Sequence, residues 1–131
     1  MAIKYRYIKN IGKRQLRDLF LSAHFDSGNY PDKLQLALKG SHHVITAWDG
    51  KKLVGLMNSL ADGVMNVFFL YLIIHPDYQK KGVGQKLVEV MLSKYKGYVR
   101  KMVMVYDDAL EFFQKCGFEV WENSVPMLVT F

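Results

Sequence analysis

The sequence predicts an α/β sandwich whose sheet is mixed and mostly antiparallel. Three observations support this prediction. The chain has 131 residues, half of them apolar, which is enough for one hydrophobic core and short for two, so we expect a single domain over residues 1–131. Segments with the period of a strand are interleaved with segments that have helical spacing. Turn residues separate these segments, and none of the intervening stretches resembles a linker.

The first third of the chain predicts a strand followed by two helices. Residues Ile3–Ile8 alternate between apolar and basic side chains, as a half-buried strand does. From Gly12 to Phe25 the apolar residues recur at helical spacing, with Asn10 as the candidate N-cap. Pro31 suits the first position of a second helix, which Gly40 ends.

The middle third predicts three antiparallel strands in a meander. Residues 42–48 and 53–60 are rich in β-branched and apolar side chains, and Asp49-Gly50 between them supplies the positive φ of a tight hairpin. A second turn at Ala61–Gly63 leads into the long apolar run of residues 64–74, which we interpret as a buried strand.

The last third predicts a helix, a strand, a helix and a closing β segment. Residues 83–95 carry an apolar helical stripe that ends before Gly97, and residues 98–106 are rich in strand formers. Residues 107–117 form the second helix, with Asp107 or Asp108 as its N-cap. One or two closing strands are expected over residues 118–122 and 126–131.

Composition limits the possible partners. The formal charge of +6 and a pI near 9.4 favour an anionic partner, which includes nucleic acid, a membrane surface or a phosphorylated small molecule. The lysines are spread along the whole chain, which argues against a dedicated nucleic-acid arm.

The longest apolar run is far shorter than the roughly 20 residues of a membrane-spanning helix. No signal-peptide pattern is evident at the N-terminus, so a cytoplasmic location is expected.

The metal-ligating residues do not predict a metal site. Cys116 is the only cysteine, which excludes a disulfide within the chain and a cage of cysteines. The four histidines contain no i, i+4 pair.

A basic, glycine-rich turn connects the long strand to the following helix. Lys80, Lys81, Gly82 and Gly84 lie where the helix begins, and the first N–H groups of a helix have no internal acceptor. Such a turn can hold a phosphate, but the same glycines also suit a tight connection, and the residues alone leave both interpretations open. The dinucleotide pattern G-x-G-x-x-G is excluded because Leu87 occupies its third glycine position, and no P-loop pattern occurs.

Two segments carry a resemblance to a known family. "IHPDYQKKGVG", from Ile74 to Gly84, matches an apolar strand, a V/I-x-P-x-[YF] turn and a [QR]-x-x-G-x-[GA] helix start. "YDDALEFFQKCGF", from Tyr106 to Phe118, is similar to the pattern N-x-x-A-x-x-F-Y-x-x-x-G-F. Together with the predicted element order, these segments resemble the GNAT superfamily of acetyl-CoA-dependent N-acetyltransferases over essentially the whole chain.

The resemblance implies a GNAT-type fold, with a sheet of six to seven strands and about four helices, and acetyl-CoA as co-substrate without a metal. It implies that the backbone of residues 72–74, at the end of the long strand, pairs with the pantetheine arm. It also implies that N–H groups from Lys80 to Gln85 bind the pyrophosphate. It also implies that the strand ending near Tyr106 forms the other wall of a fork that holds the acetyl group. The cofactor-binding residues implied in this way are Leu72, Ile73, Ile74, Gln79, Lys80, Lys81, Gly82, Val83, Gly84, Gln85 and Phe112.

The chain departs from the family at the positions that handle protons. Phe113 stands where many relatives have a tyrosine acid, Tyr106 replaces the asparagine of the same motif, and Lys101 stands where some relatives have a glutamate base. Other relatives have an acidic residue beside the fork, where this chain has Leu70 and Tyr71. Tyr106, and after it Tyr71, are the candidate catalytic acids, with water as the base.

The sequence supports three functional hypotheses. The first is direct transfer of an acetyl group, in a ternary complex, from acetyl-CoA to an amine of a small molecule or an exposed protein amine. The second is an acyl-CoA-binding sensor or interaction module with little or no transfer. The third, an RNA-binding domain, rests on charge alone and lacks a recognisable motif. We expect neither a nucleic-acid nor a membrane partner, and the sequence leaves a homodimer open.

Overall fold

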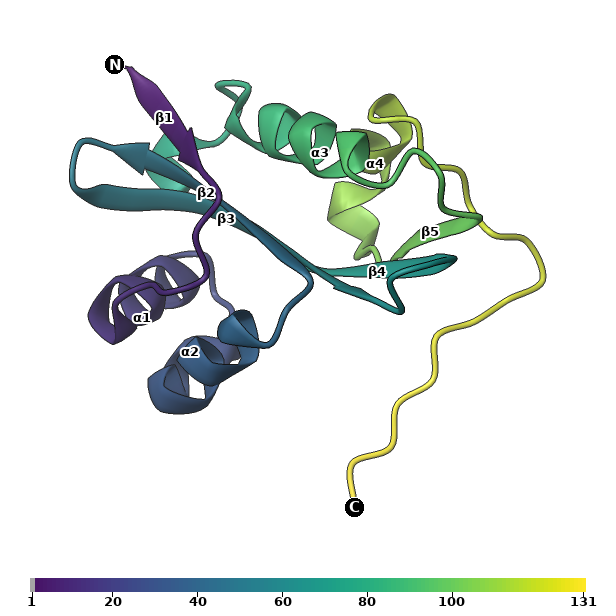
Figure 1. Ribbon diagram of the computed structural model, residues 1–131, viewed down its shortest axis with the longest axis horizontal. Helices are drawn as coiled ribbons and strands as arrows, with labels where there is room; N and C mark the ends of the chain where they lie inside the picture. Colours follow the sequence, from purple (N-terminus) through teal and green to yellow (C-terminus); the bar gives the residue numbers. More distant parts are fainter. Residues whose placement is uncertain (1) are drawn as a thin grey trace.

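The computed structural model describes residues 2–131 and contains one five-stranded sheet with helices on both faces (Figure 1). Its spatial order is β1-β2-β3-β4-β5, in which the first three neighbouring pairs are antiparallel and β4 and β5 are parallel. The strands are β1 (Ile3–Arg6), β2 (His43–Asp49), β3 (Lys52–Ala61), β4 (Asn66–Ile74) and β5 (Arg100–Val103). The predicted mixed, mostly antiparallel sheet is therefore confirmed, whereas the predicted number of six to seven strands is wrong.

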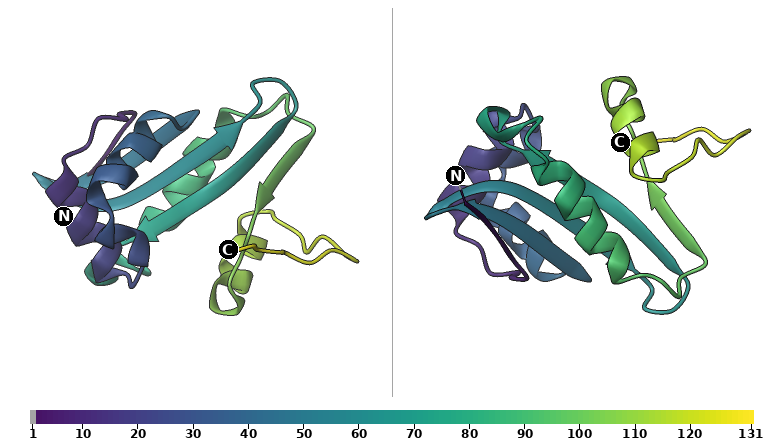
Figure 2. Two further views of the ribbon diagram at one scale, coloured as in Figure 1. Left: turned by 90° about the horizontal axis from the view of Figure 1, so that it is seen from below. Right: turned by 90° about the horizontal axis from the view of Figure 1, so that it is seen from above.

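Four helices cover the sheet, two on each face. Figures 1 and 2 show α1 and α2 on one face and α3 and α4 on the other. The helices are α1 (Lys13–Ser22), α2 (Pro31–Lys39), α3 (Val83–Ser93) and α4 (Leu110–Lys115), and three short 3₁₀ turns are η1 (Asp26–Asn29), η2 (Pro76–Tyr78) and η3 (Asp107–Ala109). The expected number of helices is confirmed. No helix within residues 2–131 is long and apolar enough to cross a membrane.

Each face of the sheet has its own hydrophobic core. On the α1 and α2 side, the predicted stripe Leu16, Leu19 and Phe20 is buried against β2, β3 and Ile73. On the other side, the predicted α3 stripe is buried against inward-facing residues of the same strands. Its fully buried members are Val83, Leu87, Met91 and Tyr95. Two-sided burial explains why β2 and β3 read as continuous apolar runs rather than as alternating ones.

The predicted closing strands are absent from the structure. Every residue from Glu119 to Phe131 is exposed, and none is in a helix or strand. A strand requires a neighbour for its N–H and C=O groups, and this segment leaves α4 without lying along β5, the edge strand (Figure 1). Asn123 has a φ of 61° and Pro126 has no N–H, so the segment bends between its two β-rich parts.

The positions predicted for the helix caps and for the end of one strand are also wrong. Gly12, not Asn10, precedes α1, and no side chain caps that helix. Residues 107–109 form the turn η3, and neither aspartate caps α4, which follows Ala109. The strand expected over residues 98–106 is paired only from Arg100 to Val103, because β5 leaves its neighbour after four residues.

Candidate active site

A fork between β4 and β5 is the central feature of the candidate site. The two parallel strands pair only from Asn66 to Phe69, opposite Arg100 to Val103. Beyond Phe69, residues Leu72–Ile74 are paired with β3 but have no partner on the β5 side. Figure 2 shows β5 diverging from β4 at this point. The predicted fork is therefore present, and β5 forms its second wall.

A β-bulge in β4 lies where the fork opens. Phe69 pairs with Ser59 and Leu72 pairs with Met57, so that Leu70 and Tyr71 together oppose the single residue Asn58. The extra residue shifts the alternation of the strand. Phe69 and Tyr71, although two residues apart, therefore contribute to cores on opposite faces of the sheet.

The side chain of Asn58 holds the bulge. It is 2% exposed, its Oδ1 accepts the N–H of Tyr71 at 2.8 Å, and its Nδ2 donates to Ser41 Oγ at 3.1 Å. The amide thus replaces the backbone partner that the bulge removes from Tyr71. Asn58 was not predicted from the sequence, although an asparagine within the apolar run LVGLMNSL is a signal that it satisfies a buried backbone group.

The bonds to β3 determine which β4 backbone groups face the fork. The N–H groups of Tyr71 and His75 point toward β3, where they donate to Asn58 Oδ1 and to the carbonyl oxygen of Val54. Alternation along the strand then directs Ile73 toward β3 and directs the N–H and C=O groups of Leu72 and Ile74 into the fork. Of the three predicted pantetheine contacts, two therefore face the fork, and the side chain of Ile73 is fully buried on the α1 side.

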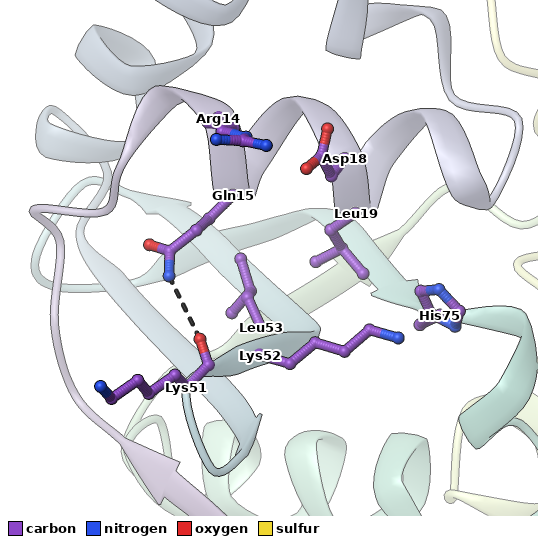
Figure 3. A pocket seen from close by; sticks show the side chains of 8 residues that line it. All are labelled: Arg14, Gln15, Asp18, Leu19, Lys51, Lys52, Leu53 and His75. Carbon is purple, nitrogen blue, oxygen red and sulfur yellow. Dashed lines mark hydrogen bonds between the residues drawn. The ribbon is translucent and has the colours of Figure 1, made fainter.

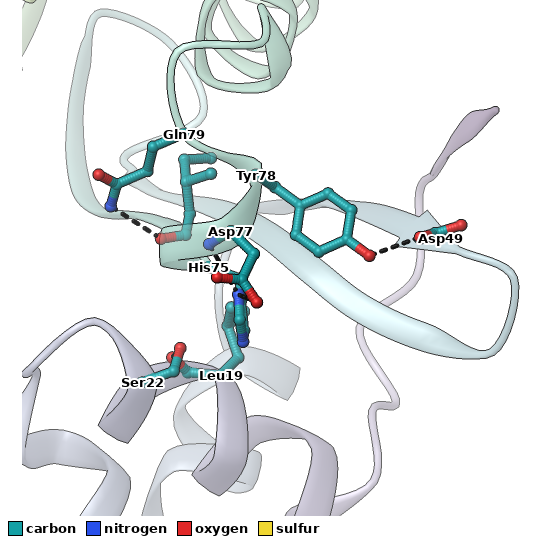
Figure 4. A network of polar contacts seen from close by, with 8 residues as sticks. Leu19, Ser22, Asp49, His75, Asp77, Tyr78 and Gln79 are labelled. Carbon is teal, nitrogen blue, oxygen red and sulfur yellow. Dashed lines mark hydrogen bonds and ion pairs between the residues drawn. The ribbon is translucent and has the colours of Figure 1, made fainter. Parts of the chain in front are cut away.

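The turn after β4 is fixed by side-chain hydrogen bonds (Figure 4). Gln79 Nε2 donates to the carbonyl oxygen of Ile74 at 3.2 Å, and the N–H of Asp77 donates to His75 Nδ1 at 3.1 Å. The hydroxyl of Tyr78 donates to Asp49 Oδ2, and this hydrogen bond is the main cause that raises the pKa of Tyr78. The turn is therefore tied both to the end of β4 and to the β2–β3 hairpin.

The first turn of α3 presents unpartnered N–H groups beside the fork. Gly82 precedes the helix with a φ of 85°, and no side chain caps it. The first intrahelical bond runs from the N–H of Lys86 to the carbonyl of Gly82, so the N–H groups of Val83, Gly84 and Gln85 have no helical acceptor. A Cβ at Gly82 would meet nothing within 4 Å, so the space beside this glycine is open. This geometry fits an anion such as a pyrophosphate.

Gly84 allows the start of α3 to pack against α4 and β4. A Cβ placed there would lie 3.3 Å from Phe112 Cζ and 3.6 Å from Ile74 Cγ1. Phe112, which the resemblance assigned to cofactor binding, thus contacts the start of α3. Lys80 and Lys81 are exposed, and Lys80 adopts a φ of 60°. The Lys81 ammonium lies 5.9 Å from the ring centre of Tyr78.

The residues at the proton-handling positions lie in different environments. Tyr71 is partly buried, packs edge-on against Phe20 at 5.0 Å, and shares a 2.8 Å hydrogen bond with Ser27 Oγ. Tyr106 follows β5 and is 71% exposed. Lys101 Nζ donates to the carbonyl of Tyr98 at 2.9 Å. Phe113 is only 7% exposed and belongs to the core. No hydrogen bond or ring contact within residues 2–131 joins the two tyrosines.

A pocket of about 260 Å³ lies between α1 and the β2–β3 hairpin, at the end of β4 (Figure 3). Its position on the α1 face separates it from the first turn of α3, which lies on the other face. Gln15 Nε2 donates to the carbonyl of Lys51 across it. The lining residues are Arg14, Gln15, Asp18, Leu19, Lys51, Lys52, Leu53 and His75. This pocket was not predictable from the sequence, because its residues come from three separate segments. Within the described residues, no group of three or more His, Cys, Asp or Glu is placed to hold a metal ion.

Comparison with known proteins identifies the family. Residues 40–120 match the family described as "Acetyltransferase (GNAT) domain". The matched residues make up more than half of the chain. An uncharacterised N-acetyltransferase, ycf52, of Pyropia yezoensis is 24% identical, and the match covers 84% of this chain and 75% of that protein.

Solved structures support the fold. A GNAT-family acetyltransferase of Streptococcus pneumoniae has a TM-score of 0.86 at 23% identity, covering 99% of this chain and 98% of that one. An aminoglycoside acetyltransferase from an uncultured soil metagenomic sample, in complex with sisomicin, has a TM-score of 0.76 at 23% identity. The match covers 98% of this chain and 96% of that one. At these identities the solved structures show the fold alone, while the sequence match of residues 40–120 shows the family. The chain belongs to the GNAT acetyltransferases.

Proposed function

We propose that this protein transfers an acetyl group from acetyl-CoA to an amine of a small molecule or an exposed protein amine, by direct transfer in a ternary complex. One observation carries the proposal: the open edge of β4 is followed, after the turn of residues 75–82, by the uncapped first turn of α3. This edge and this helix start offer consecutive backbone donors suited first to the amides of a pantetheine arm and then to a pyrophosphate.

Each part of the fork has a proposed task. The backbone groups of Leu72 and Ile74 pair with the pantetheine arm as an added strand would, and the N–H of Leu72 polarises the thioester carbonyl. Acetyl-CoA supplies an activated thioester, which an amine attacks from the opposite wall. The N–H groups of Val83, Gly84 and Gln85 bind the pyrophosphate, with Lys80, Lys81 and Lys86 adding positive charge around them.

Tyr106 is the first candidate for the group that protonates the leaving thiolate. Its side chain is exposed beside the end of β5, whereas the hydroxyl of Tyr71 is engaged by Ser27. Lys101 is unsuited to act as a base because its Nζ is engaged by the carbonyl of Tyr98. Water therefore takes the proton of the attacking amine, and general acid catalysis by Tyr106 contributes roughly 10²-fold or more to the rate.

A second function, acyl-CoA binding without efficient transfer, is favoured by one specific observation. Phe113 stands at the position of the family tyrosine, has no ionisable proton, and packs in the core between Phe112 and Phe118 at ring distances of 5.2 and 5.6 Å. Under this alternative the fork binds the same ligand, and only the turnover differs.

Calorimetry with acetyl-CoA tests the binding step that both functions share. We expect micromolar binding by the wild type and a loss of at least about tenfold in Gly82→Glu, because the carboxylate would occupy the anion site. Gly63→Glu is the matched control, because Gly63 also has a positive φ, of 88°, and open space around its Cβ but lies in the β3–β4 turn. Absence of wild-type binding, or an equal loss in both variants, would refute the site.

Thiol release with a panel of amines, including an aminoglycoside, separates the two functions. Transfer predicts amine-dependent release of CoA, and Tyr106→Phe should lower kcat with little change in the affinity for acetyl-CoA. Tyr71→Phe should instead lower stability by about 1 kcal/mol through loss of the Ser27 hydrogen bond, with most of the turnover retained. If Tyr106→Phe keeps full turnover, the proposed acid is wrong, and if no amine releases CoA, the binding function is favoured.

A further inference from the structure

The pocket between α1 and the β2–β3 hairpin has an apolar floor and a basic rim (Figure 3). Leu19 and Leu53 form the floor and are 1% and 4% exposed, so they belong to the hydrophobic core on this face of the sheet. Arg14 on α1, with Lys51 and Lys52 in the hairpin, lines the pocket with exposed side chains. Two packed elements therefore bring positive charges from separate segments to one cavity.

The cations of the rim are not neutralised by neighbouring acids. Arg14, Lys51 and Lys52 form no ion pair with any of residues 2–131. Asp18 also lines the pocket, but its Oδ1 accepts hydrogen bonds from Arg17 Nε and Nη2 at 3.2 and 3.1 Å. Three positive charges less the negative charge of Asp18 leave the lining with a formal charge of +2. A single unpaired surface lysine is ordinary, but three cations around one cavity create a potential that attracts an anion.

Two neutral side chains add hydrogen-bond donors to the pocket. His75 Nδ1 accepts the N–H of Asp77 at 3.1 Å, so the proton of the neutral imidazole is on Nε2. Gln15 Nε2 uses one of its two N–H groups for the carbonyl of Lys51. Within residues 2–131, the Nε2–H of His75 and the second N–H of Gln15 have no acceptor. Figure 3 shows His75 at one end of the pocket and Gln15 at the other.

The charge and size of the pocket indicate the class of ligand. A phosphate monoester carries a charge of about −1.5 to −2 at neutral pH and has three strong acceptor oxygens, which matches the charge and the donors of the lining better than a singly charged carboxylate does. The planar guanidinium of Arg14 can bind two of these oxygens at once. The volume of about 260 Å³ is at the lower limit of ligand pockets, which favours a small molecule over a nucleotide.

We propose that this pocket binds the phosphate group of a small phosphorylated molecule, at a site separate from that of acetyl-CoA. Arg14 and Lys52 supply the charge-assisted hydrogen bonds, and His75 and Gln15 supply the neutral ones. The proposal does not depend on the transfer reaction, because the pocket lies on the α1 face of the sheet and the first turn of α3 lies on the other face.

NMR titration of the isotope-labelled protein with inorganic phosphate and with glycerol 3-phosphate tests the site directly. We expect saturable shifts of the Gln15 side-chain amide, the backbone amides of Lys51 and Lys52, and the ring nitrogens of His75. The amides of Val83 and Gly84 report separately on anions at the start of α3. Potassium chloride at the same ionic strength is the control for screening and should not reproduce the shifts.

A pair of double variants with equal changes of charge tests the residues. Arg14→Gln combined with Lys52→Gln should weaken phosphate binding at the pocket by at least about tenfold, because two charge-assisted hydrogen bonds are lost. Lys33→Gln combined with Lys96→Gln removes two exposed cations away from the pocket and should change the affinity by less than about twofold. Thermal unfolding followed by circular dichroism verifies that both variants are folded.

Four results would overturn the proposal. The first is an absence of saturable shifts at the pocket, or shifts that chloride reproduces. The second is an equal affinity for phosphate in the two double variants. The third is displacement of phosphate from the pocket by acetyl-CoA, which would assign the pocket to the cofactor site. The fourth is tighter binding of a short RNA than of glycerol 3-phosphate at the same residues, which would make the rim a nucleic-acid surface. A failure of acetyl-CoA to bind would refute the proposed function and leave this site unaffected.

Discussion

Replacement of Asn58 by leucine is the sharpest test of how the fork is built. Asn58 is buried, and its amide makes the two hydrogen bonds that replace regular pairing at the bulge of β4. Leucine has a similar size but can neither accept the N–H of Tyr71 nor donate to Ser41. The variant therefore removes the polar function of the side chain while largely keeping its volume.

The structure gives the magnitude of the effect. Two hydrogen bonds contribute about 1 kcal/mol each, and leaving the N–H of Tyr71 buried without an acceptor costs about 1–3 kcal/mol more. The apolar surface of leucine offsets about 1 kcal/mol of this loss. We expect Asn58→Leu to lower the free energy of unfolding by about 2–4 kcal/mol. Because the bulge sets the direction of Leu72 and Ile74, the affinity for acetyl-CoA should fall as well.

Urea unfolding followed by circular dichroism measures the first effect, and calorimetry measures the second. Asn29→Leu, at an exposed position in η1, is the control and should change the free energy of unfolding by less than about 0.5 kcal/mol. If Asn58→Leu is as stable as this control, the amide does not hold the bulge. If it is destabilised but binds acetyl-CoA with wild-type affinity in its folded state, the bulge does not set the geometry of the fork.

Three further variants test the surroundings of the site. Gly84→Val should lower the free energy of unfolding by about 1–3 kcal/mol and weaken acetyl-CoA binding, because the methyl groups of valine would overlap Phe112. Gly84→Ala should have a smaller effect. If urea unfolding shows the alanine variant to be less stable than the valine variant, this packing is contradicted. Tyr95→Phe should cost about 1–3 kcal/mol in the same assay, because Ser59 Oγ and His42 Nδ1 each lose their hydrogen bond to the Tyr95 hydroxyl, and a neutral result would refute the contribution of these hydrogen bonds. Burial, aided by nearby positive charges, lowers the pKa of His43 in the folded protein, so the unfolded chain binds the proton more tightly. The free energy of unfolding should therefore decrease as the pH falls below about 6.5. His43→Gln should make this decrease with pH less steep, and an unchanged pH dependence would show that His43 is not its source.

Local patterns predicted most of the fold because local and tertiary preferences agree there. The stripe on α3 is amphipathic with a 3.6-residue period, and the hairpin at Gly50 has the positive φ that its sequence demands. The glycine turn at Gly82 was predictable for the same reason, since a strand, two glycines and a helix start follow one another in the sequence. Its interpretation as a phosphate site came from the family resemblance and not from the local pattern.

The failures have a different origin, because they depend on neighbours that are distant in the sequence. Residues 126–131 have strand composition, but a strand also needs an adjacent edge, and composition does not say which edge is within reach. The bulge at Leu70 and Tyr71 is set by Asn58 on another strand, so its position and the resulting orientation of Ile73 were not accessible from the run of apolar residues. Asp107 and Asp108 favour a helix start, but the chain forms a 3₁₀ turn there first.

Residue-resolved amide hydrogen exchange, with and without acetyl-CoA, tests the central claim most directly. If the ligand lies along the open edge of β4 and on the first turn of α3, protection should rise at Leu72, Ile74, Val83 and Gly84, whose N–H groups lack partners in the free protein. The N–H of Ile73, which already faces β3, should change little. Binding without added protection at these four amides would contradict the proposed site.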